Sequence, residues 1–207
     1  MRRLLHLLPS PLRTVVEVLL TLGVAVLIVW VARAHAANAY TVPTSSMEPT
    51  LMPGDYVIAD RLSLDFESPS RGQIVVFHPP HCTAGHSGDR GVCDTTSLAD
   101  RAGLAQTIFI KRVIGLPGDT IWARNGHVWV KPASGPAFRL HEPYVDAGRE
   151  LGGLPLVRTT IPKGYYLMLG DNRQVSDDSR GWGLEPRSGI IGIARVRYWP
   201  LSRAGTL

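Results

Sequence analysis

One apolar run near the N-terminus limits what this 207-residue chain can fold into. It reads VVEVLLTLGVAVLIVWVA, from Val15 to Ala32. About 18 residues at helical rise span about 27 Å, close to the hydrocarbon thickness of a bilayer, whereas the apolar core of a secretory signal is about 7–15 residues long. The run therefore predicts a membrane-spanning helix over residues 15–33. The small-residue stretch ARAHAANA that follows is typical of a cleavage site and leaves a cleaved signal as the alternative.

The charged residues around this run predict its orientation. Arg2, Arg3 and Arg13 precede it, and Arg33 alone follows directly. Because lysine and arginine concentrate on the cytoplasmic side, the N-terminus is predicted in the cytoplasm and the rest of the chain outside. No second run approaches spanning length, so we expect a single-pass protein of the cell membrane. The formal charge of +5 then favours anionic lipid headgroups over nucleic acid, which an outward-facing domain does not meet.

Residues 40–207 are predicted to form a mainly β domain with few or no helices. Short β-branched runs such as DYVIAD, GQIVVFHP and GYYLML alternate with Gly, Pro and Asp turns. Asn125-Gly126, in IWARNGHVWV, is the strongest hairpin signal in the chain. Two polar or Gly- and Pro-rich stretches are predicted to be insertions. The expected organisation is cytoplasmic residues 1–14, a transmembrane helix over 15–33, and an outer domain over 40–207 with insertions at about 78–106 and 131–155.

Two polar positions are candidate catalytic groups. Ser46 lies in the Pro-flanked turn VPTSSMEPTLMPGD, but a serine needs a base to act as a nucleophile, and the histidines show no spacing typical of a Ser-His-Asp triad. Lys111, in QTIFIKRVIGLPGDT, shares a strand face with Phe109 and Val113, and an apolar face can desolvate an amine and lower its pKa. Periodicity alone favours a more ordinary role for Lys111, which is to protect an edge strand from pairing.

Three segments considered together resemble a known family. VPTSSMEPTLMPGD, FIKRVIGLPGD and LGDNRQVSDDSRGWG follow an apolar N-terminal helix in that order. This arrangement resembles the conserved boxes of the type I (leader) signal peptidases, membrane-bound Ser-Lys serine proteases that release exported proteins from the membrane. The resemblance extends from about Val15 to Trp199, with gaps at the two insertions. It implies a catalytic core of coiled antiparallel β-sheets, an accessory β-region formed by the second insertion, and no cofactor.

The resemblance also implies a role for individual residues. Ser46 matches the nucleophile and Lys111 the general base, while Thr44 completes the oxyanion hole with the Ser46 N–H and Ser176 orients the lysine. The supporting charged residues are Asp171, Asp178, Arg180 and Arg112. The pocket for small residues, mostly alanine, at the first and third positions before the cut is implied at Val42, Met47, Leu51, Phe109 and Ile110. Ser45 stands where bacterial members usually have glycine, and it is the alternative nucleophile.

Other functions stay open at this point. A processing protease dedicated to a single exported substrate would carry the same residues. An anchored, non-catalytic β-domain that binds peptides is the alternative from another class, although it has no use for a desolvated lysine beside a serine. The expected partners are signal peptides of exported preproteins and membrane lipid. Because ARAHAANA resembles a site that such an enzyme cuts, self-cleavage near Ala36 or Ala39 is a further hypothesis.

The chain has two cysteines, Cys82 and Cys93, in the first predicted insertion. In an outward-facing loop they favour one disulfide. The nearby His78, His81 and His86 make zinc the alternative, although the spacing matches no standard zinc signature. Because Ser-Lys chemistry needs no metal, none is expected.

Overall fold

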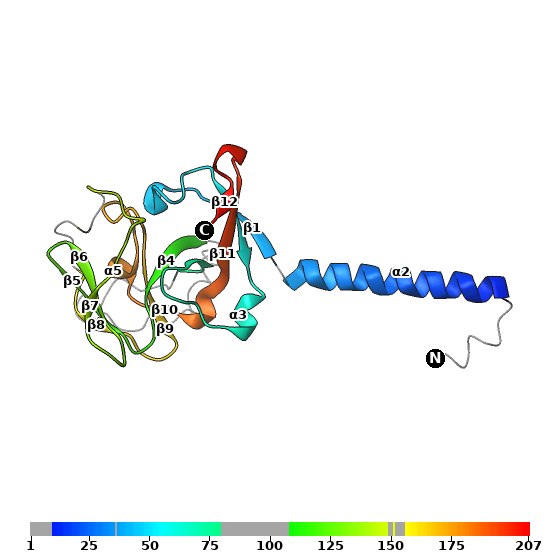
Figure 1. The fold of residues 1–207 in the computed structure, drawn as a ribbon, viewed down its shortest axis with the longest axis horizontal. Helices are drawn as coiled ribbons and strands as arrows, with labels where there is room; N and C mark the ends of the chain where they lie inside the picture. The colour runs from blue at the N-terminus through cyan, green and yellow to red at the C-terminus, as the bar shows by residue number, and fades with distance from the viewer. Residues whose placement is uncertain (1–9, 36, 80–107, 149–150, 152–155) are drawn as a thin grey trace, which may run out of the picture. The chain divides into compact units, whose positions relative to one another are not determined.

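The computed structural model describes residues 10–35, 37–79, 108–148, 151 and 156–207 (Figure 1). The chain forms two compact units, which divide after Ala37. In the first, α2 (Ser10–His35) contains the whole apolar run, and most of its described aliphatic side chains are exposed. Among the residues whose side chains the structure describes, no helix combines the length and the hydropathy that a membrane span requires.

The second unit is mainly β, which confirms the mainly β part of the predicted fold class. Its larger sheet has the strand order β1-β2-β11-β3-β4-β9-β10, and β12 pairs with β11. The pairs among β2, β3, β4, β9, β10, β11 and β12 are antiparallel, and β11 carries register shifts against β2 and β3 that curl the sheet. The strands are β1 (Ala37–Thr41), β2 (Tyr56–Asp60), β3 (Ile74–Phe77), β4 (Phe109–Gly115), β9 (Tyr165–Leu169), β10 (Glu185–Pro186), β11 (Ile190–Trp199) and β12 (Gly205–Thr206).

A smaller sheet, called the accessory sheet below, has the strand order β7-β6-β5-β8. The hairpin predicted at Asn125-Gly126 is confirmed: Arg124 pairs with His127 across it, and the two turn residues have φ values of 52° and 77°, as a type I′ turn requires. The accessory strands are β5 (Thr120–Arg124), β6 (His127–Lys131), β7 (Phe138–Arg139) and β8 (Thr159–Thr160). Only β7 comes from the predicted second insertion.

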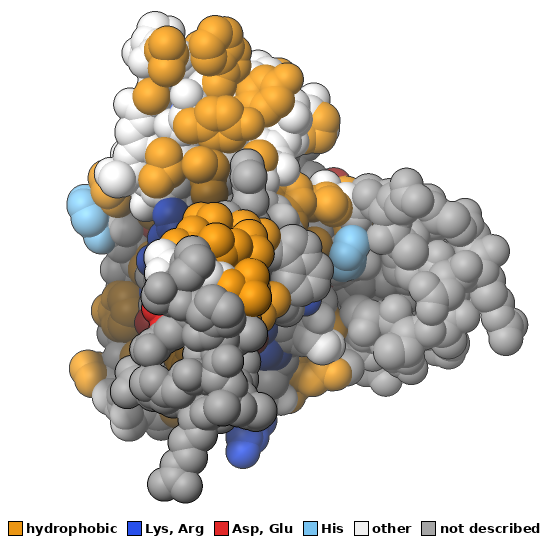
Figure 2. All heavy atoms as spheres, turned by 90° about the vertical axis from the view of Figure 1, so that its right-hand side faces the viewer, with side chains coloured by type: hydrophobic (Ala, Val, Ile, Leu, Met, Phe, Trp, Pro, Cys, Tyr) orange, Lys and Arg blue, Asp and Glu red, His pale blue; other side chains and the backbone are white. Residues whose placement is uncertain are grey.

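The described helical segments of the second unit are all short. They are η1 (Ser45–Met47), α3 (Ser63–Phe66), α5 (Ser179–Trp182), η3 (Arg187–Gly189) and η4 (Leu201–Arg203). Exposed apolar side chains gather beside η4 at the end of β11, where Tyr198, Trp199 and Leu201 are 37%, 51% and 75% exposed (Figure 2). Tyr56 packs edge-on against Tyr198 with ring centroids 5.9 Å apart. These residues form the apolar surface of the β11 end.

Strands β3 and β4 are buried on both faces. The sequence of β3 is continuously apolar instead of alternating, whereas β4 carries the buried charged residues Lys111 and Arg112. Ile74 and Val76 pack in one apolar cluster, and Val75 and Phe77 pack in another. Lys111, in β4, is the cross-strand partner of Val75. Because β4 lies between β3 and β9 in the interior of the sheet, Lys111 cannot protect an edge strand from pairing. That alternative interpretation of Lys111 is therefore wrong.

The carboxyl group of Glu185, in β10, is buried without a hydrogen-bond partner among the described residues. The residue is 0% exposed. Burial raises the pKa of Glu185 from 4.5 to about 9. The folded protein therefore keeps a proton that the unfolded chain releases, and this group lowers stability progressively as the pH rises from about 4.5 to about 9.

We expect Glu185→Gln to stabilise the protein more at high pH than at low pH, because glutamine cannot ionise in the unfolded chain. The gain in unfolding free energy is expected to grow by a few kcal/mol between about pH 5 and pH 8.5. Urea unfolding at both pH values measures it. Glu67→Gln, at a carboxyl group with a 54% exposed side chain, is the matched control and is expected to show no such growth. Equal gains for Glu185→Gln at both pH values would contradict a neutral buried carboxyl group.

Candidate active site

Ser46 lies in η1, a short 3₁₀ turn between β1 and β2, and is 8% exposed. The next residue, Met47, anchors the turn in an apolar core cluster. Asn172 holds the turn from the other side: its N–H donates to Ser46 O at 3.1 Å, and its Nδ2 donates to Ser45 O at 3.2 Å. The third sequence box therefore fixes the backbone of the serine turn. Sequence reasoning assigned no role to Asn172, although its place in GDNR was a signal for one.

Lys111 Nζ lies 2.8 Å from Ser46 Oγ. The lysine is 4% exposed, and its amine also donates to Ile110 O at 3.2 Å and lies 5.3 Å from the centroid of the Phe109 ring. Burial lowers the pKa of Lys111 to about 8, against the opposing effect of nearby carboxylates. A large fraction of the amine is therefore neutral at mildly alkaline pH, and a neutral amine at this distance can accept the serine proton.

Thr44 lies beside the same hydroxyl, because its Oγ1 is 3.1 Å from Ser46 Oγ. Ser176, which the resemblance implies as the residue that orients the lysine, makes no hydrogen bond to the Lys111 amine in this structure. Its Oγ is buried and makes no hydrogen bond with any described residue, and the Lys111 amine donates to Ser46 and Ile110. Ser176 packs against Gly170, where an added Cβ would lie 2.2 Å from Ser176 Oγ and 2.4 Å from Ser46 O. The missing side chain at Gly170 is what allows this approach.

The predicted supporting residues form two ion pairs, and the first joins β4 to the loop after β9. Arg112 Nε donates to Asp171 Oδ1 at 2.8 Å, and Arg112 Nη2 donates to Oδ2 at 2.6 Å. Asp171 is fully buried and also accepts a 2.5 Å hydrogen bond from Thr50, which follows the serine turn. The Arg112 guanidinium lies 3.9 Å from the centroid of the Tyr144 ring. This pair therefore ties the Lys111 strand to both loops of the site.

The second ion pair is local to the start of α5. Arg180 Nε donates to Asp178 Oδ1 at 2.7 Å, and Asp178 Oδ2 accepts the Gly170 N–H at 3.1 Å. Arg180 Nη2 also donates to Arg173 O at 2.7 Å and to Ser176 O at 3.1 Å. The four supporting residues thus form two separate pairs instead of one network.

A cavity of about 320 Å³ opens beside Ser46 and Lys111. Four of the five residues implied for the substrate pocket line it, namely Val42, Met47, Phe109 and Ile110. Leu51 does not: it is 0% exposed and packs in the core cluster behind the cavity, so this assignment is corrected. Sequence reasoning missed four lining residues, which are Pro43, Ile108, Val175 and Asp177.

The structure does not test the predicted disulfide or the zinc alternative. Cys82 and Cys93 lie outside the described residues, as do His81 and His86, so the disulfide and the zinc alternative both stay predictions. His78 follows β3, and its N–H donates to Gly189 O at 2.9 Å.

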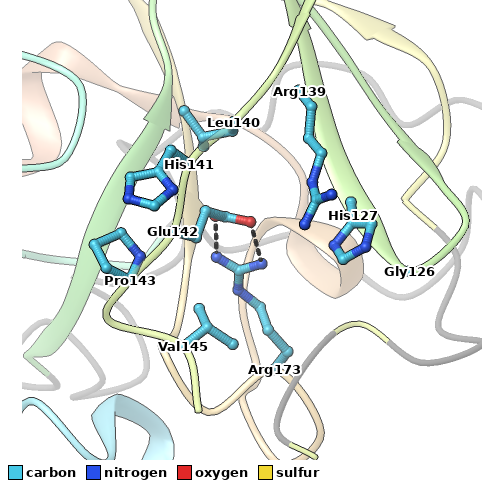
Figure 3. A pocket seen from close by; sticks show the side chains of 9 residues that line it. All are labelled: Gly126, His127, Arg139, Leu140, His141, Glu142, Pro143, Val145 and Arg173. Atoms are coloured by element: carbon cyan, nitrogen blue, oxygen red, sulfur yellow. Dashed lines mark hydrogen bonds and ion pairs between the residues drawn. The ribbon is translucent and has the colours of Figure 1, made fainter. Parts of the chain in front are cut away.

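A larger cavity of about 490 Å³ lies beside the accessory sheet, and neither Ser46 nor Lys111 lines it (Figure 3).

Residues 15–199 match the family described as "Signal peptidase, peptidase S26". The chain is 36% identical to signal peptidase I of Leptolyngbya laminosa, over 96% of this chain and 85% of that protein. It is 30% identical to signal peptidase IB of Staphylococcus aureus, over 92% of each. A crystal structure of a signal peptidase I from Enterococcus faecalis V583 aligns with a TM-score of 0.41 and 26% identity, and covers 61% of this chain and 97% of that chain.

Proposed function

Because this chain belongs to the signal peptidase family, peptidase S26, we propose that it is a membrane-anchored serine endopeptidase that removes signal peptides from exported preproteins. Ser46 is the nucleophile and Lys111 is the general base. The observation that carries this proposal is the 2.8 Å contact between the buried lysine amine and the serine hydroxyl, at the edge of an apolar cavity.

The proposed reaction uses Lys111 twice. The neutral amine accepts the Ser46 proton as Oγ attacks the scissile carbonyl, and the ammonium then protonates the departing amine of the mature protein. The signal peptide is left as an ester on Ser46. Lys111 next takes a proton from water, which attacks the ester, and returns that proton to Ser46 Oγ as the signal peptide leaves. The released carboxylic acid loses its proton to the solvent.

The oxyanion of each tetrahedral intermediate needs donors that are already in place. Thr44 Oγ1, 3.1 Å from Ser46 Oγ, is proposed to donate to it together with the Ser46 N–H. Ser176 is proposed to hold Lys111 during the reaction, since its buried hydroxyl has no partner among the described residues and lies against Gly170 beside the serine turn. The Arg112–Asp171 pair keeps the lysine strand and the serine turn in register.

The membrane anchor is proposed from the sequence of α2. A helix of 26 residues is about 39 Å long, and the run from Val15 to Ala32 inside it is apolar except for Glu17, Thr21 and Gly23. The apolar surface of the β11 end adds a contact suited to lipid, because exposed tryptophan and tyrosine favour the headgroup region. Both features would keep the cavity near the bilayer, where signal peptides emerge.

The cleavage rate is expected to follow the protonation of Lys111. Asp178, Asp177 and Asp171 raise the pKa of Lys111 against the larger lowering by burial, which leaves it at about 8. An ammonium cannot accept the serine proton, so kcat/KM is expected to fall about tenfold for each pH unit below about pH 8 and to level off above it. Asp177→Asn is expected to move this limb to lower pH.

A pH-rate profile of the wild type, Asp177→Asn and the control Asp65→Asn measures this effect. Asp65 lies on α3 and is not among the acids that act on Lys111. A rate that is flat between about pH 6 and pH 8 would contradict Lys111 as the base.

The apolar cavity is expected to select small residues before the cut. We expect full-length protein in detergent to cleave a preprotein that ends its signal in Ala-x-Ala. Replacing the last alanine by leucine is expected to lower kcat/KM by about a hundredfold or more, because a larger side chain does not fit beside Met47 and Ile110. Equal cleavage of both substrates would contradict the proposed pocket. Comparing several unrelated preproteins separates a general signal peptidase from a protease dedicated to one substrate.

A further inference from the structure

The outer face of the accessory sheet carries aromatic side chains. Side chains alternate along a strand, and Ile121, Val128 and Val130 belong to a buried apolar cluster. Trp122 and Trp129 therefore lie on the opposite, outer face, where both are partly exposed. This face is separate from the cavity that contains Ser46.

Four side chains form a row across this face. Trp122 and Trp129 are cross-strand partners whose rings stack at 16° with centroids 6.2 Å apart. The Arg158 guanidinium lies 4.5 Å from the centroid of the Trp122 ring, and Arg139 is the cross-strand partner of Trp129 on the other side. The row therefore runs cation, aromatic, aromatic, cation. At about 4.8 Å for each strand, it extends over roughly 15 Å.

The charge of this face has one sign. Arg124, His127 and Lys131 lie on it too, because they alternate with the buried residues of β5 and β6. The four accessory strands contain no aspartate and no glutamate. None of Arg124, Lys131, Arg139 and Arg158 pairs with a carboxylate in the part of the chain that the structure describes.

The cavity of about 490 Å³ adjoins the end of this row, because Arg139 and His127 also line it. Figure 3 shows these two side chains on one side of the cavity and His141 on the other, with the Arg173–Glu142 pair between them. Arg173 Nη1 lies 3.2 Å from Glu142 Oε2, so the charges of that pair cancel. Because Arg139 is the remaining charged side chain of the lining, the cavity carries a net positive charge at neutral pH.

We propose that the row and the cavity bind an anionic glycan, a saccharide chain that carries carboxylate or phosphate groups. The two partly exposed indoles offer apolar surface to the C–H groups of sugar rings. Arg158 and Arg139, one at each end, match acidic groups with the planar fork that arginine presents to carboxylate and phosphate. The cavity beside Arg139 accepts the acidic substituent at that end.

Other polyanions fit this face less well. A lipid surface favours protruding apolar side chains, as at the β11 end, whereas the apolar groups of this face are two indoles packed on each other. Single-stranded nucleic acid would also stack on aromatic rings in a basic groove. The topology proposed above places the accessory sheet outside the cell, where it does not meet nucleic acid. The exclusion of nucleic acid therefore rests on the proposed function.

Titration calorimetry of full-length protein in detergent with a mannuronate hexasaccharide tests the proposal, with maltohexaose as the neutral probe. We expect the acidic sugar to bind and the neutral one not to bind. Trp122→Ala, Arg139→Gln and Arg158→Gln are each expected to weaken binding by about tenfold or more. The matched controls Trp199→Ala and Arg195→Gln change an exposed tryptophan and an exposed arginine elsewhere, and they are expected to bind as the wild type does.

Competition and a parallel activity assay make each outcome decisive. Poly-glutamate, a DNA oligonucleotide or phosphatidylglycerol vesicles that displace the hexasaccharide at equal charge concentration would overturn the glycan assignment, as would equal weakening in the controls. Thermal unfolding shows that each variant is folded, and Trp122→Ala is expected to cleave a preprotein at the wild-type rate. A wild type that binds the hexasaccharide but cleaves nothing would overturn the proposed function and leave this inference standing.

Discussion

Replacing Ser46 by alanine is expected to lower kcat/KM on a signal-peptide substrate by about 10⁴-fold or more, because no other group can form the ester. The Lys111 amine has two hydrogen-bond partners among the described residues, Ser46 Oγ and the carbonyl of Ile110. Only the first can act as a nucleophile. Initial rates on one peptide, with a detection limit below the expected residual rate, measure the loss.

The neighbouring serine provides the control. Ser45 lines the cavity and contributes its carbonyl to Asn172, but its hydroxyl makes no contact with Lys111 that the structure records. Ser45→Ala is therefore expected to stay within about tenfold of the wild type. The reverse result, with Ser45→Ala inactive and Ser46→Ala active, would show that the nucleophile is assigned to the wrong serine.

Lys111 is tested by the same assay with two replacements. Lys111→Met fills the space without a base, and Lys111→Arg keeps the charge but stays protonated at any accessible pH, so both are expected to be as inactive as Ser46→Ala. Because removing a buried amine relieves desolvation, Lys111→Met is expected to unfold at the wild-type temperature or above it. Substantial activity in Lys111→Arg would mean that the lysine is not the base.

Removing Asp171 is expected to give the largest loss of stability among the site residues. The carboxylate is fully buried and accepts two hydrogen bonds from Arg112 and one from Thr50. Asp171→Ala leaves a guanidinium that is 8% exposed without its counter-ion, which costs about 3–5 kcal/mol in unfolding free energy. Urea unfolding of the variant and the wild type measures the difference.

An exposed ion pair and a double variant control this measurement. Glu67→Ala breaks the pair with Arg195, whose side chains are 54% and 40% exposed, and is expected to cost less than about 1 kcal/mol. Arg112→Met combined with Asp171→Leu removes both charges and is expected to recover part of the loss. If Asp171→Ala costs no more than Glu67→Ala, the buried pair does not hold the site together.

Local sequence patterns predicted the parts of the fold that depend on local chemistry. The hairpin at Asn125-Gly126 formed as expected because two residues with positive φ favour the type I′ turn whatever surrounds them. Burial is not local. Glu185-Pro186 has the composition of a turn, yet it pairs with β9 as the last strand of the sheet and is buried there, and nothing in the sequence marks the carboxyl group as buried.

The candidate site depends on contacts between distant segments. Ser46 and Lys111 are 65 positions apart, and only the order of the three sequence boxes indicated that they meet. The direction of a side chain depends on the backbone of its turn, which is why Leu51 was assigned to the pocket although it points into the core. The row on the accessory sheet follows from strand register, which spacing along the chain does not reveal.

The N-terminus of the product tests the proposed cleavage most directly. Full-length wild type and Ser46→Ala, each in lipid vesicles, are incubated with a preprotein whose signal ends in Ala-x-Ala, and the products are sequenced. The wild type is expected to release a mature protein that begins directly after the second alanine, and Ser46→Ala is expected to release none. Cleavage at another bond, or equal cleavage by folded Ser46→Ala, would contradict the proposed function.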